Sequence, residues 1–278
     1  MQNSNGSVEI RHITGGGYLK VVILAGGFGT RISEESHLRP KPMIEIGDAP
    51  ILWHICKYYF SFGFNEFIIC CGYMGYMIKK YFADYYLYNN DITFDFTAEN
   101  KMIVHTNVVE PWKVTVVDTG LHTQTGGRIK RIAHYIGEER FMLTYGDGVS
   151  DIDLSKLIET HEKSGKTVTL SAIRPSGRFG VLDINEDNGT ITGFHEKAQV
   201  GSAWINGGFM VMEPEVFEYI DDDTTVLERE PLERLSADGK LVVYRHYGYW
   251  KCMDTARDKH ALEADLANGN AKWKVWKD

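Results

Sequence analysis

The residues best suited to chemistry in this sequence form a glycine-rich segment, 26–31, with cations inside and beside it. The segment directly follows a β-branched run at 20–25 and ends in Arg31. Glycines after a buried strand let the backbone turn sharply and point N–H groups at an anion. Lys41 follows ten residues after Arg31, between two prolines that restrict its backbone. The combination predicts a phosphate site, although glycines after strands also serve plain turns.

Two better-known phosphate loops do not fit this segment. A dinucleotide-binding fingerprint that starts at Gly27 needs a third glycine at the position of Ile32. A Walker loop needs Gly-Lys followed by Ser or Thr, whereas Gly29 is followed by Thr30 and Arg31. We therefore expect neither a hydride-transfer enzyme nor a P-loop kinase.

Residues 24–31 (Leu-Ala-Gly-Gly-Phe-Gly-Thr-Arg) and 40–43 (Pro-Lys-Pro-Met) resemble the signature of the sugar-1-phosphate nucleotidylyltransferases. The likeness covers nearly the whole chain from about residue 19 and includes further matching segments at 67–73, 110–112, 125–128, 145–148, 177–180, 205–208 and 253–255. It implies an α/β fold with a Rossmann-like, mixed and mainly parallel sheet of the glycosyltransferase-A type. A smaller α+β part toward the C-terminus would bind the sugar.

The resemblance also implies roles for particular residues. Arg31, Lys41 and Lys197 are expected to be catalytic. The nucleotide is expected to contact residues of the loop and its surroundings: Leu24, Ala25, Gly26, Gly27, Gly29, Thr30, Arg31, Lys41, Thr123, Thr125, Arg128 and Gly146. The sugar phosphate is expected to contact Gly180, Glu196, Lys197 and Asn206. Asp147 and Asp254 are expected to share a magnesium ion, which prefers carboxylates, water and phosphate oxygens.

Without the resemblance, several of these residues have ordinary structural interpretations. An aspartate such as Asp147, at the end of an apolar strand, is more often a helix cap or turn residue. Gly180 reads as a strand glycine, and Asn206 as a polar strand residue. Ala198 stands where the family usually has proline, so the turn after Lys197 is less restricted. The metal and sugar roles therefore depend on the family resemblance.

The substrates implied by the resemblance are CTP and glucose 1-phosphate. A phosphate oxygen of the sugar would attack the α-phosphorus in line and release pyrophosphate. Because that nucleophile is already an anion, the reaction requires no general base. Cytosine presents an amino donor where uracil and thymine present a carbonyl, and we expect residues 123–128 to lie beside the base. UTP or dTTP with another sugar phosphate is the alternative, as is a non-catalytic nucleotide sensor on the same fold.

Strand and helix patterns alternate along the first half of the chain, which favours a parallel sheet with right-handed crossovers. Strands are predicted at 20–25, 66–71, 113–117, 141–145, 168–173, 203–212 and 241–244, with short segments at 181–184 and 190–195. Helices are predicted at 50–62, 75–87, 128–136, 154–163, 215–220, 228–237 and 256–267. We expect an extension at 1–18 and one domain at 19–278, with a nucleotide-binding half at 19–150 and a sugar-binding half at 151–278.

Composition excludes several other classes of protein. With 43% hydrophobic and 24% charged residues, the chain is expected to be globular. A net charge of −8 argues against a nucleic-acid partner. The sequence has neither a stretch of spanning length nor the apolar core of a signal peptide, so we expect no membrane partner and a cytoplasmic location. The resemblance adds a homo-oligomer, with a hexamer as one form, and a role in making bacterial surface polysaccharide such as the O-antigen of lipopolysaccharide.

Overall fold

The centre of the molecule is a seven-stranded sheet. The computed structural model describes residues 19–276 apart from the stretches 98–99, 175–180, 185–190 and 196–203. The strands lie in the order β14 (Leu241–Arg245), β10 (Val168–Ile173), β13 (Ile205–Met212), β8 (Phe141–Tyr145), β1 (Lys20–Ala25), β4 (Glu66–Cys71) and β7 (Lys113–Asp118). Only β13 runs antiparallel to its neighbours in this sheet, so the expected mixed, mainly parallel sheet is confirmed.

Strand β1 divides the hydrophobic core into two parts. Its sequence is rich in β-branched residues, which suits a strand covered on both faces. Because side chains alternate along a strand, Val21 and Ile23 pack into one cluster, while Val22 and Leu24 pack into the other. The strand is parallel to both of its neighbours, β4 and β8. Its carboxyl end, and with it the glycine loop, therefore lies beside the carboxyl ends of both.

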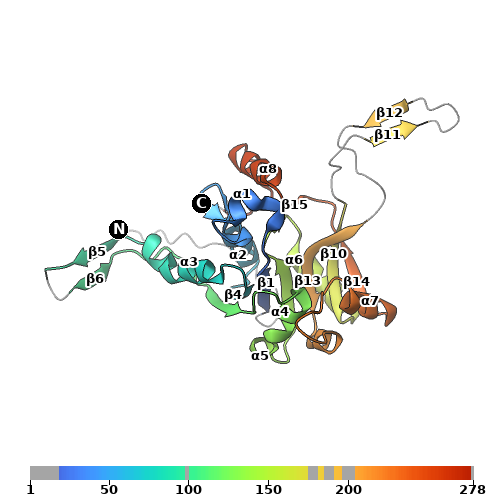
Figure 1. Cartoon of the computed structure of the whole chain (residues 1–278), viewed down its shortest axis with the longest axis horizontal. Coiled ribbons are helices and arrows are strands. Elements are labelled where there is room, and N and C mark those ends of the chain that lie inside the picture. Colours follow the sequence, from blue (N-terminus) through green and yellow to red (C-terminus); the bar gives the residue numbers. More distant parts are fainter. Residues whose placement is uncertain (1–18, 98–99, 175–180, 185–190, 196–203, 277–278) are drawn as a thin grey trace, which may run out of the picture.

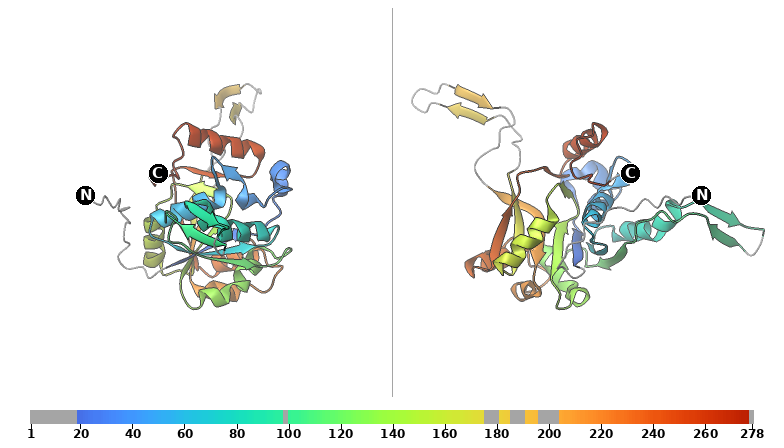
Figure 2. Two further views of the ribbon diagram at one scale, coloured as in Figure 1. Left: turned by 90° about the vertical axis from the view of Figure 1, so that its left-hand side faces the viewer. Right: turned by 180° about the vertical axis from the view of Figure 1, so that it is seen from behind.

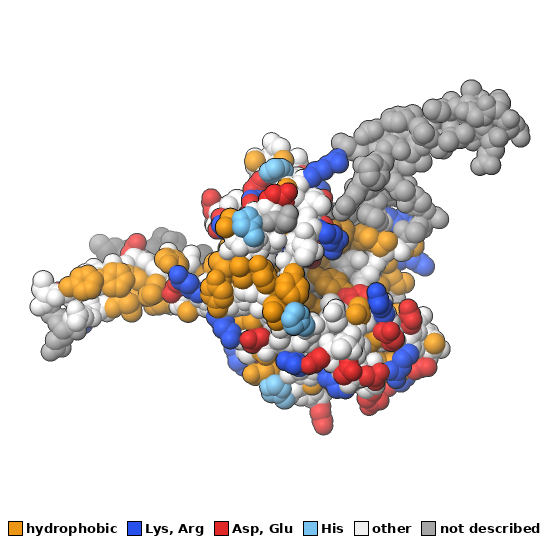
Figure 3. All heavy atoms as spheres, viewed as in Figure 1, with side chains coloured by type: hydrophobic (Ala, Val, Ile, Leu, Met, Phe, Trp, Pro, Cys, Tyr) orange, Lys and Arg blue, Asp and Glu red, His pale blue; other side chains and the backbone are white. Residues whose placement is uncertain are grey.

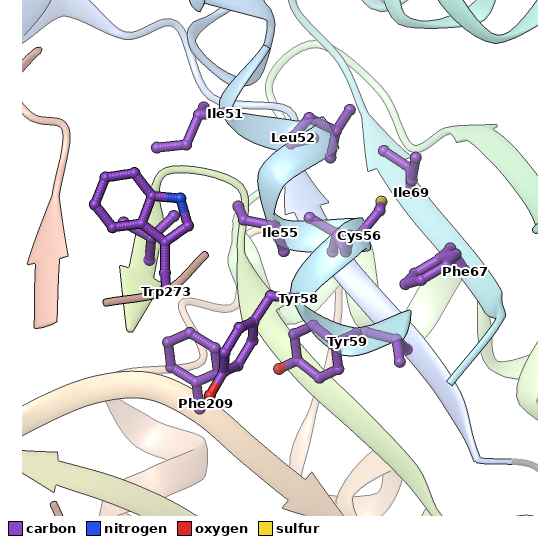
Figure 4. Close-up of a cluster of buried hydrophobic side chains, with 14 of the residues drawn as sticks. Ile51, Leu52, Ile55, Cys56, Tyr58, Tyr59, Phe67, Ile69, Phe209 and Trp273 are labelled. Carbon is purple, nitrogen blue, oxygen red and sulfur yellow. The ribbon is translucent and has the colours of Figure 1, made fainter. Parts of the chain in front are cut away.

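Helices cover both faces of the sheet (Figures 1 and 2). One core contains residues from α2 (Ile51–Ser61), α3 (Gly75–Tyr88), α6 (Leu154–Ser164) and α8 (Ala256–Ala267). The other contains residues from α4 (Thr125–Arg131), α5 (Ala133–Ile136), α7 (Glu230–Ala237) and the 3-10 helix η3 (Pro214–Tyr219). Figure 4 shows α2 in the first core, where the ring of Tyr59 stacks on Phe209 of β13 with centroids 6.0 Å apart.

Shorter elements surround this frame. The glycine loop is followed by η1 (Thr30–Ile32), α1 (Ser33–Ser36) and η2 (Lys41–Met43). Four strand pairs lie outside the main sheet: β2 (Glu45–Ile46) with β3 (Ala49–Pro50), β5 (Ile92–Asp95) with β6 (Lys101–Val104), β9 (Gly148–Ser150) with β15 (Trp250–Cys252), and β11 (Val181–Ile184) with β12 (Ile191–His195). The pairing of β9 with β15 matters most for function, because it places the chain after Cys252 beside Asp147.

The β5–β6 hairpin projects from the body beyond the end of α3 (Figures 1 and 2). Hydrophobic side chains gather along it in Figure 3, and Phe94 and Phe96 are 55% and 80% exposed. An isolated two-stranded hairpin is only marginally stable in water. This arm therefore exposes large apolar side chains beyond the body of the molecule.

Most of the predicted strands and helices are confirmed within a few residues, but three predicted helices differ in the structure. The helix predicted at 128–136 is divided into α4 and α5, which meet at Ile132. The segment at 215–220 forms the 3-10 helix η3, and the helix predicted at 228–237 begins only at Glu230. Within the part of the chain that the structure describes, no helix has the length and apolar character needed to cross a membrane.

Candidate active site

A cavity of about 490 Å³ opens at the carboxyl ends of β1 and β8. In open α/β sheets, ligands bind at this edge of the sheet. All the residues that the sequence assigned to nucleotide or metal line the cavity: Leu24, Ala25, Gly26, Gly27, Gly29, Thr30, Arg31, Lys41, Thr123, Thr125, Arg128, Gly146, Asp147 and Asp254. The structure thus brings together residues from four well-separated parts of the chain.

The glycine loop has a backbone conformation that explains part of its composition. Gly29 has a φ of 66°, in the left-handed region that favours glycine. Its carbonyl accepts a hydrogen bond from the N–H of Ile32 at 3.0 Å, and this turn starts η1. Gly27 has open space where a side chain would point. The loop therefore leaves backbone exposed to the cavity, as a phosphate-binding loop requires.

Two cationic side chains, Lys41 and Arg31, meet Asp254 and Asp147 at one end of the cavity. Lys41 Nζ donates to Asp147 Oδ2 at 2.6 Å and to Asp254 Oδ1 at 2.7 Å. Arg31 Nη1 donates to Asp254 Oδ2 at 2.8 Å. Asp254 is brought here by β15, since the N–H of Met253 donates to the carbonyl of Asp147 at 2.8 Å. The two carboxylates consequently converge on a single cationic atom.

The charges in this cluster reinforce one another. Burial alone would lower the pKa of Lys41, but the carboxylates of Asp147 and Asp254 outweigh it and raise that pKa above its usual value. Burial alone would raise the pKa of Asp254, but Lys41 and Arg31 outweigh it and lower that pKa. Both groups therefore stay charged across the physiological pH range.

The two aspartates suit a magnesium ion, which needs only one or two protein carboxylates, better than a metal that is held entirely by protein ligands. Among the residues that the structure describes, no cluster of three or more His, Cys, Asp or Glu side chains is arranged to hold a metal. Magnesium commonly takes one or two carboxylates and completes its coordination with water and substrate phosphates. Asp147 and Asp254 meet that requirement, because one oxygen of each already contacts the same cationic atom, Lys41 Nζ, at 2.6 and 2.7 Å.

Arg128 lines the cavity, but its guanidinium is committed to the protein. Nη1 donates to the carbonyls of Gly120 at 2.7 Å and Cys71 at 3.2 Å and to Thr119 Oγ1 at 2.8 Å, while Nη2 donates to the carbonyl of Gly26 at 3.0 Å. The side chain thus ties the glycine loop to the ends of β4 and β7. Its expected contact with the nucleotide stays a prediction.

Arg128→Met is expected to destabilise the protein by about 3 kcal/mol, because it leaves several buried acceptors without a donor. Urea unfolding would measure the loss. Arg131→Met is a matched control on the same helix, since the partner of Arg131 is the half-exposed Asp223 and exposed pairs contribute about 0–1 kcal/mol. Equal stability of the two variants would contradict this role for Arg128.

The start of α4 docks closely on the backbone of residues 223–228. The N–H groups of Gly126 and Gly127 both donate to the carbonyl of Thr225, at 3.0 and 3.3 Å. A Cβ on Gly127 would lie 2.5 Å from Cα of Asp223. The paired glycines that follow Thr125 therefore serve close backbone approach.

Gly127→Ala is expected to cost about 1–3 kcal/mol of unfolding free energy, the usual range for overpacking. Thermal or urea unfolding would measure it. Gly148→Ala provides the control, because a Cβ there would make only an ordinary contact, 3.9 Å from the carbonyl of Lys251. An unchanged stability of Gly127→Ala would show that the docking is looser than described.

The sugar-side predictions are only partly accessible. Gly180, Glu196 and Lys197 lie outside the described residues. Asn206 does not line the cavity, but its Nδ2 lies 3.5 Å from the hydroxyl oxygen of Tyr145, which does. Its Oδ1 accepts the N–H of Gly208 at 2.9 Å. Asn206 is thus adjacent to the cavity through Tyr145.

Sequence reasoning gave no individual role to six residues that line the cavity, although two of them, Phe28 and Gln124, lie within segments assigned to it: Phe28, Pro42, Leu121, His122, Gln124 and Tyr145. Phe28 lies in the glycine loop itself, and its ring packs 5.9 Å from that of His122. Its position between two loop glycines was a usable signal. Tyr145 had a signal too, since it ends β8 immediately before Gly146 and Asp147.

Comparisons with known proteins agree with this geometry. A family model described as nucleotidyl transferase matches residues 20–267. The chain is 53% identical over 259 residues to glucose-1-phosphate cytidylyltransferase of Salmonella typhimurium, covering 93% of this chain and 100% of the relative. It is 44% identical over 260 residues to the probable glucose-1-phosphate cytidylyltransferase of Bacillus subtilis, with the same coverage.

Solved structures support the fold. HddC from Yersinia pseudotuberculosis matches with a TM-score of 0.65 and 24% identity, over 89% of this chain and 99% of that one. UDP-glucose pyrophosphorylase from Acinetobacter baumanii matches with a TM-score of 0.67 and 19% identity, over 92% and 95%. Because the family model spans most of the chain and the cytidylyltransferases align over their whole length, the chain belongs to the nucleotidyl transferase family.

Proposed function

We propose that this enzyme transfers a cytidylyl group from CTP to α-D-glucose 1-phosphate, giving CDP-glucose and pyrophosphate. The observation that carries the proposal is the convergence of the glycine loop, Arg31, Lys41, Asp147 and Asp254 on one cavity. The choice of CTP and glucose follows from 53% identity to a glucose-1-phosphate cytidylyltransferase over that relative's full length. A uridylyltransferase of Synechocystis is only 29% identical over 51% of its length, so UTP is the weaker alternative.

The reaction forms a bond between a phosphate oxygen of the sugar and the α-phosphorus, and breaks the bond from that phosphorus to the bridging oxygen. The electron pair leaves with pyrophosphate. Arg31 and Lys41 bind the triphosphate and neutralise charge as it builds, and Lys197 does the same for the sugar phosphate. Asp147 and Asp254 would hold magnesium, which when bound neutralises phosphate oxygens in the transition state. The loop amides orient the phosphates for in-line attack.

Several finer assignments belong to the same proposal. Magnesium is the metal, and Gly180, Glu196, Lys197 and Asn206 bind the sugar phosphate. The described part of the chain is one domain with a nucleotide-binding and a sugar-binding half, which is supported by a single sheet running through both. The enzyme acts in the cytoplasm and supplies CDP-glucose for the synthesis of bacterial surface polysaccharide. It is a homo-oligomer, with a hexamer as one form, and the exposed apolar side chains of the β5–β6 arm support self-association.

A pyrophosphate-release assay with magnesium, over four nucleoside triphosphates and several sugar 1-phosphates, tests the function. We expect the highest kcat/KM for CTP with glucose 1-phosphate. A higher value for UTP or dTTP would replace the cytidylyl assignment. Nucleotide binding without pyrophosphate release in any combination would contradict the enzymatic function itself.

A further inference from the structure

Glu228 is joined to two residues of the cavity although it does not line the cavity itself. It lies in the turn just before α7, and its carboxylate accepts hydrogen bonds from two hydroxyl groups. Thr125 Oγ1 donates to Glu228 Oε2 at 2.6 Å, and the hydroxyl of Tyr145 donates to Oε1. Thr125 comes from the start of α4 and Tyr145 from the end of β8. One carboxylate thus connects two walls of the cavity.

The backbone just before Glu228 is docked on the start of α4, while the Glu228 side chain itself is exposed. The segment 223–228 is docked on the start of α4 by the hydrogen bonds from Gly126 and Gly127 to Thr225. The N–H of Leu227 donates to Thr125 Oγ1 at 2.9 Å, and the Leu227 side chain is fully buried. The backbone position of Glu228 relative to Thr125 is therefore set by the contacts of Thr225 and Leu227, which closely precede it.

These bonds decide where the hydroxyl protons point. An ionised carboxylate can only accept hydrogen bonds, so both hydroxyls must direct their protons at Glu228. Thr125 Oγ1 also accepts the N–H of Leu227 at 2.9 Å, and Asn206 Nδ2 lies 3.5 Å from the Tyr145 hydroxyl oxygen. The remaining capacity of both oxygens for another partner is lone pairs alone. Any substrate group that reaches either hydroxyl meets a hydrogen-bond acceptor.

We propose that Glu228 is a positioning residue that makes Thr125 and Tyr145 acceptors, so that the cavity selects substrates which present a hydrogen-bond donor there. This inference rests on the proposed function for the identity of the donor. In that reaction the donor is either the 4-amino group of cytosine, which uracil lacks, or a hydroxyl of the sugar. Both groups are hydrogen-bond donors, and substrate analogues that lack one or the other distinguish them.

Glu228→Gln tests the proposal because it keeps the shape of the side chain. The amide oxygen can accept from one hydroxyl, but the amide NH₂ must donate to the other, which turns that hydroxyl's proton toward the cavity. We expect KM for the donor-bearing substrate to rise about tenfold, the effect of roughly one hydrogen bond, with kcat changed far less. Glu230→Gln removes the same charge two residues later and is the matched control.

Substrate pairs identify the source of the donor. If the amino group of cytosine is recognised, the preference for CTP over UTP in kcat/KM falls about tenfold in Glu228→Gln. If a sugar hydroxyl is recognised, the preference for glucose 1-phosphate over one of its monodeoxy analogues falls instead. Both preferences should be unchanged in Glu230→Gln. A loss that is equal for all substrates, or no loss at all, would overturn the proposal.

Two further variants keep the test decisive if Glu228→Gln does not fold. Tyr145→Phe and Thr125→Val each remove one hydroxyl and leave Glu228 in place. At least one of these variants should lose the preference for the donor-bearing substrate. If Glu228→Gln does fold, the double variant should lose less of this preference than the sum of the two single losses. Unchanged preferences in both folded variants would also refute the role of Glu228. Wild-type turnover of CTP and glucose 1-phosphate tests the proposed function separately, since the comparison of variants can use whichever substrates the wild type accepts.

Discussion

Lys41→Met is expected to lower kcat by about 10²–10³-fold, the usual loss when one charge-stabilising group is removed from a transition state. The side chain is only 11% exposed and lies between two carboxylates, so bulk water cannot replace its charge. Pyrophosphate release at saturating CTP and glucose 1-phosphate measures the effect. Lys113→Met is the control, because Lys113 is 72% exposed in a pair with Glu66. Wild-type turnover in Lys41→Met would remove Lys41 from the mechanism.

The same substitution should also destabilise the metal-free protein, by about 2–3 kcal/mol. It leaves Asp147 and Asp254 facing each other without their shared cation, and breaking a buried pair costs about 3–5 kcal/mol before allowance for the partly exposed Asp147. The lowered pKa of Asp254 contributes stability above its usual value of 3.8, which is lost as the pH falls below it. The raised pKa of Lys41 contributes stability below its usual value of 10.5, which is lost at higher pH. Urea unfolding should therefore show the largest difference from wild type between these limits.

Arg31→Ala is expected to lower turnover by about 10²–10³-fold while leaving the fold intact. Its side chain is 74% exposed and, among the residues that the structure describes, forms its one ion pair with Asp254 at 2.8 Å. Such a pair contributes about 0–1 kcal/mol to stability. Loss of activity without loss of stability would thus distinguish Arg31 from Lys41.

Steady-state kinetics and thermal unfolding of the same preparation test both halves of this expectation. Arg39→Ala is the matched control, since Arg39 is a nearby arginine that pairs with Glu45 outside the cavity. Full activity in Arg31→Ala would refute its binding of the triphosphate. A large drop in stability would instead show that Arg31 has a structural role that its contacts do not reveal.

Short-range sequence patterns were sufficient to predict the frame of the molecule. The strand at 20–25 is found at those residues, because a β-branched run that enters glycines has few other conformations. The positions of the loop and of Lys41 were predictable too, because glycine and proline determine the conformation of the backbone at their own and adjacent residues. Asp147 and Asp254 needed the family resemblance, because β9 and β15, which bring them together, have only three residues each and no detectable periodicity.

The roles of Arg128 and Glu228 could not be predicted from local sequence. Arg128 reads as an ordinary helical cation, and only the tertiary structure brings the carbonyl of Gly26, 102 positions away, to its guanidinium. Glu228 fell inside a predicted helix that in fact begins at Glu230. Its bond to Thr125 spans 103 positions. Partners at that separation are chosen by how segments pack, for which one sequence holds no direct signal.

The ion pair between Arg31 and Asp254 joins positions 223 residues apart, and this separation affects how the enzyme is made. During synthesis the second carboxylate leaves the ribosome 223 residues after Arg31 of the glycine loop. A nascent chain stopped after β8 could contain the loop and Lys41 yet lack Asp254. The charged cluster can therefore assemble only after the strands of both halves of the sheet have been synthesised.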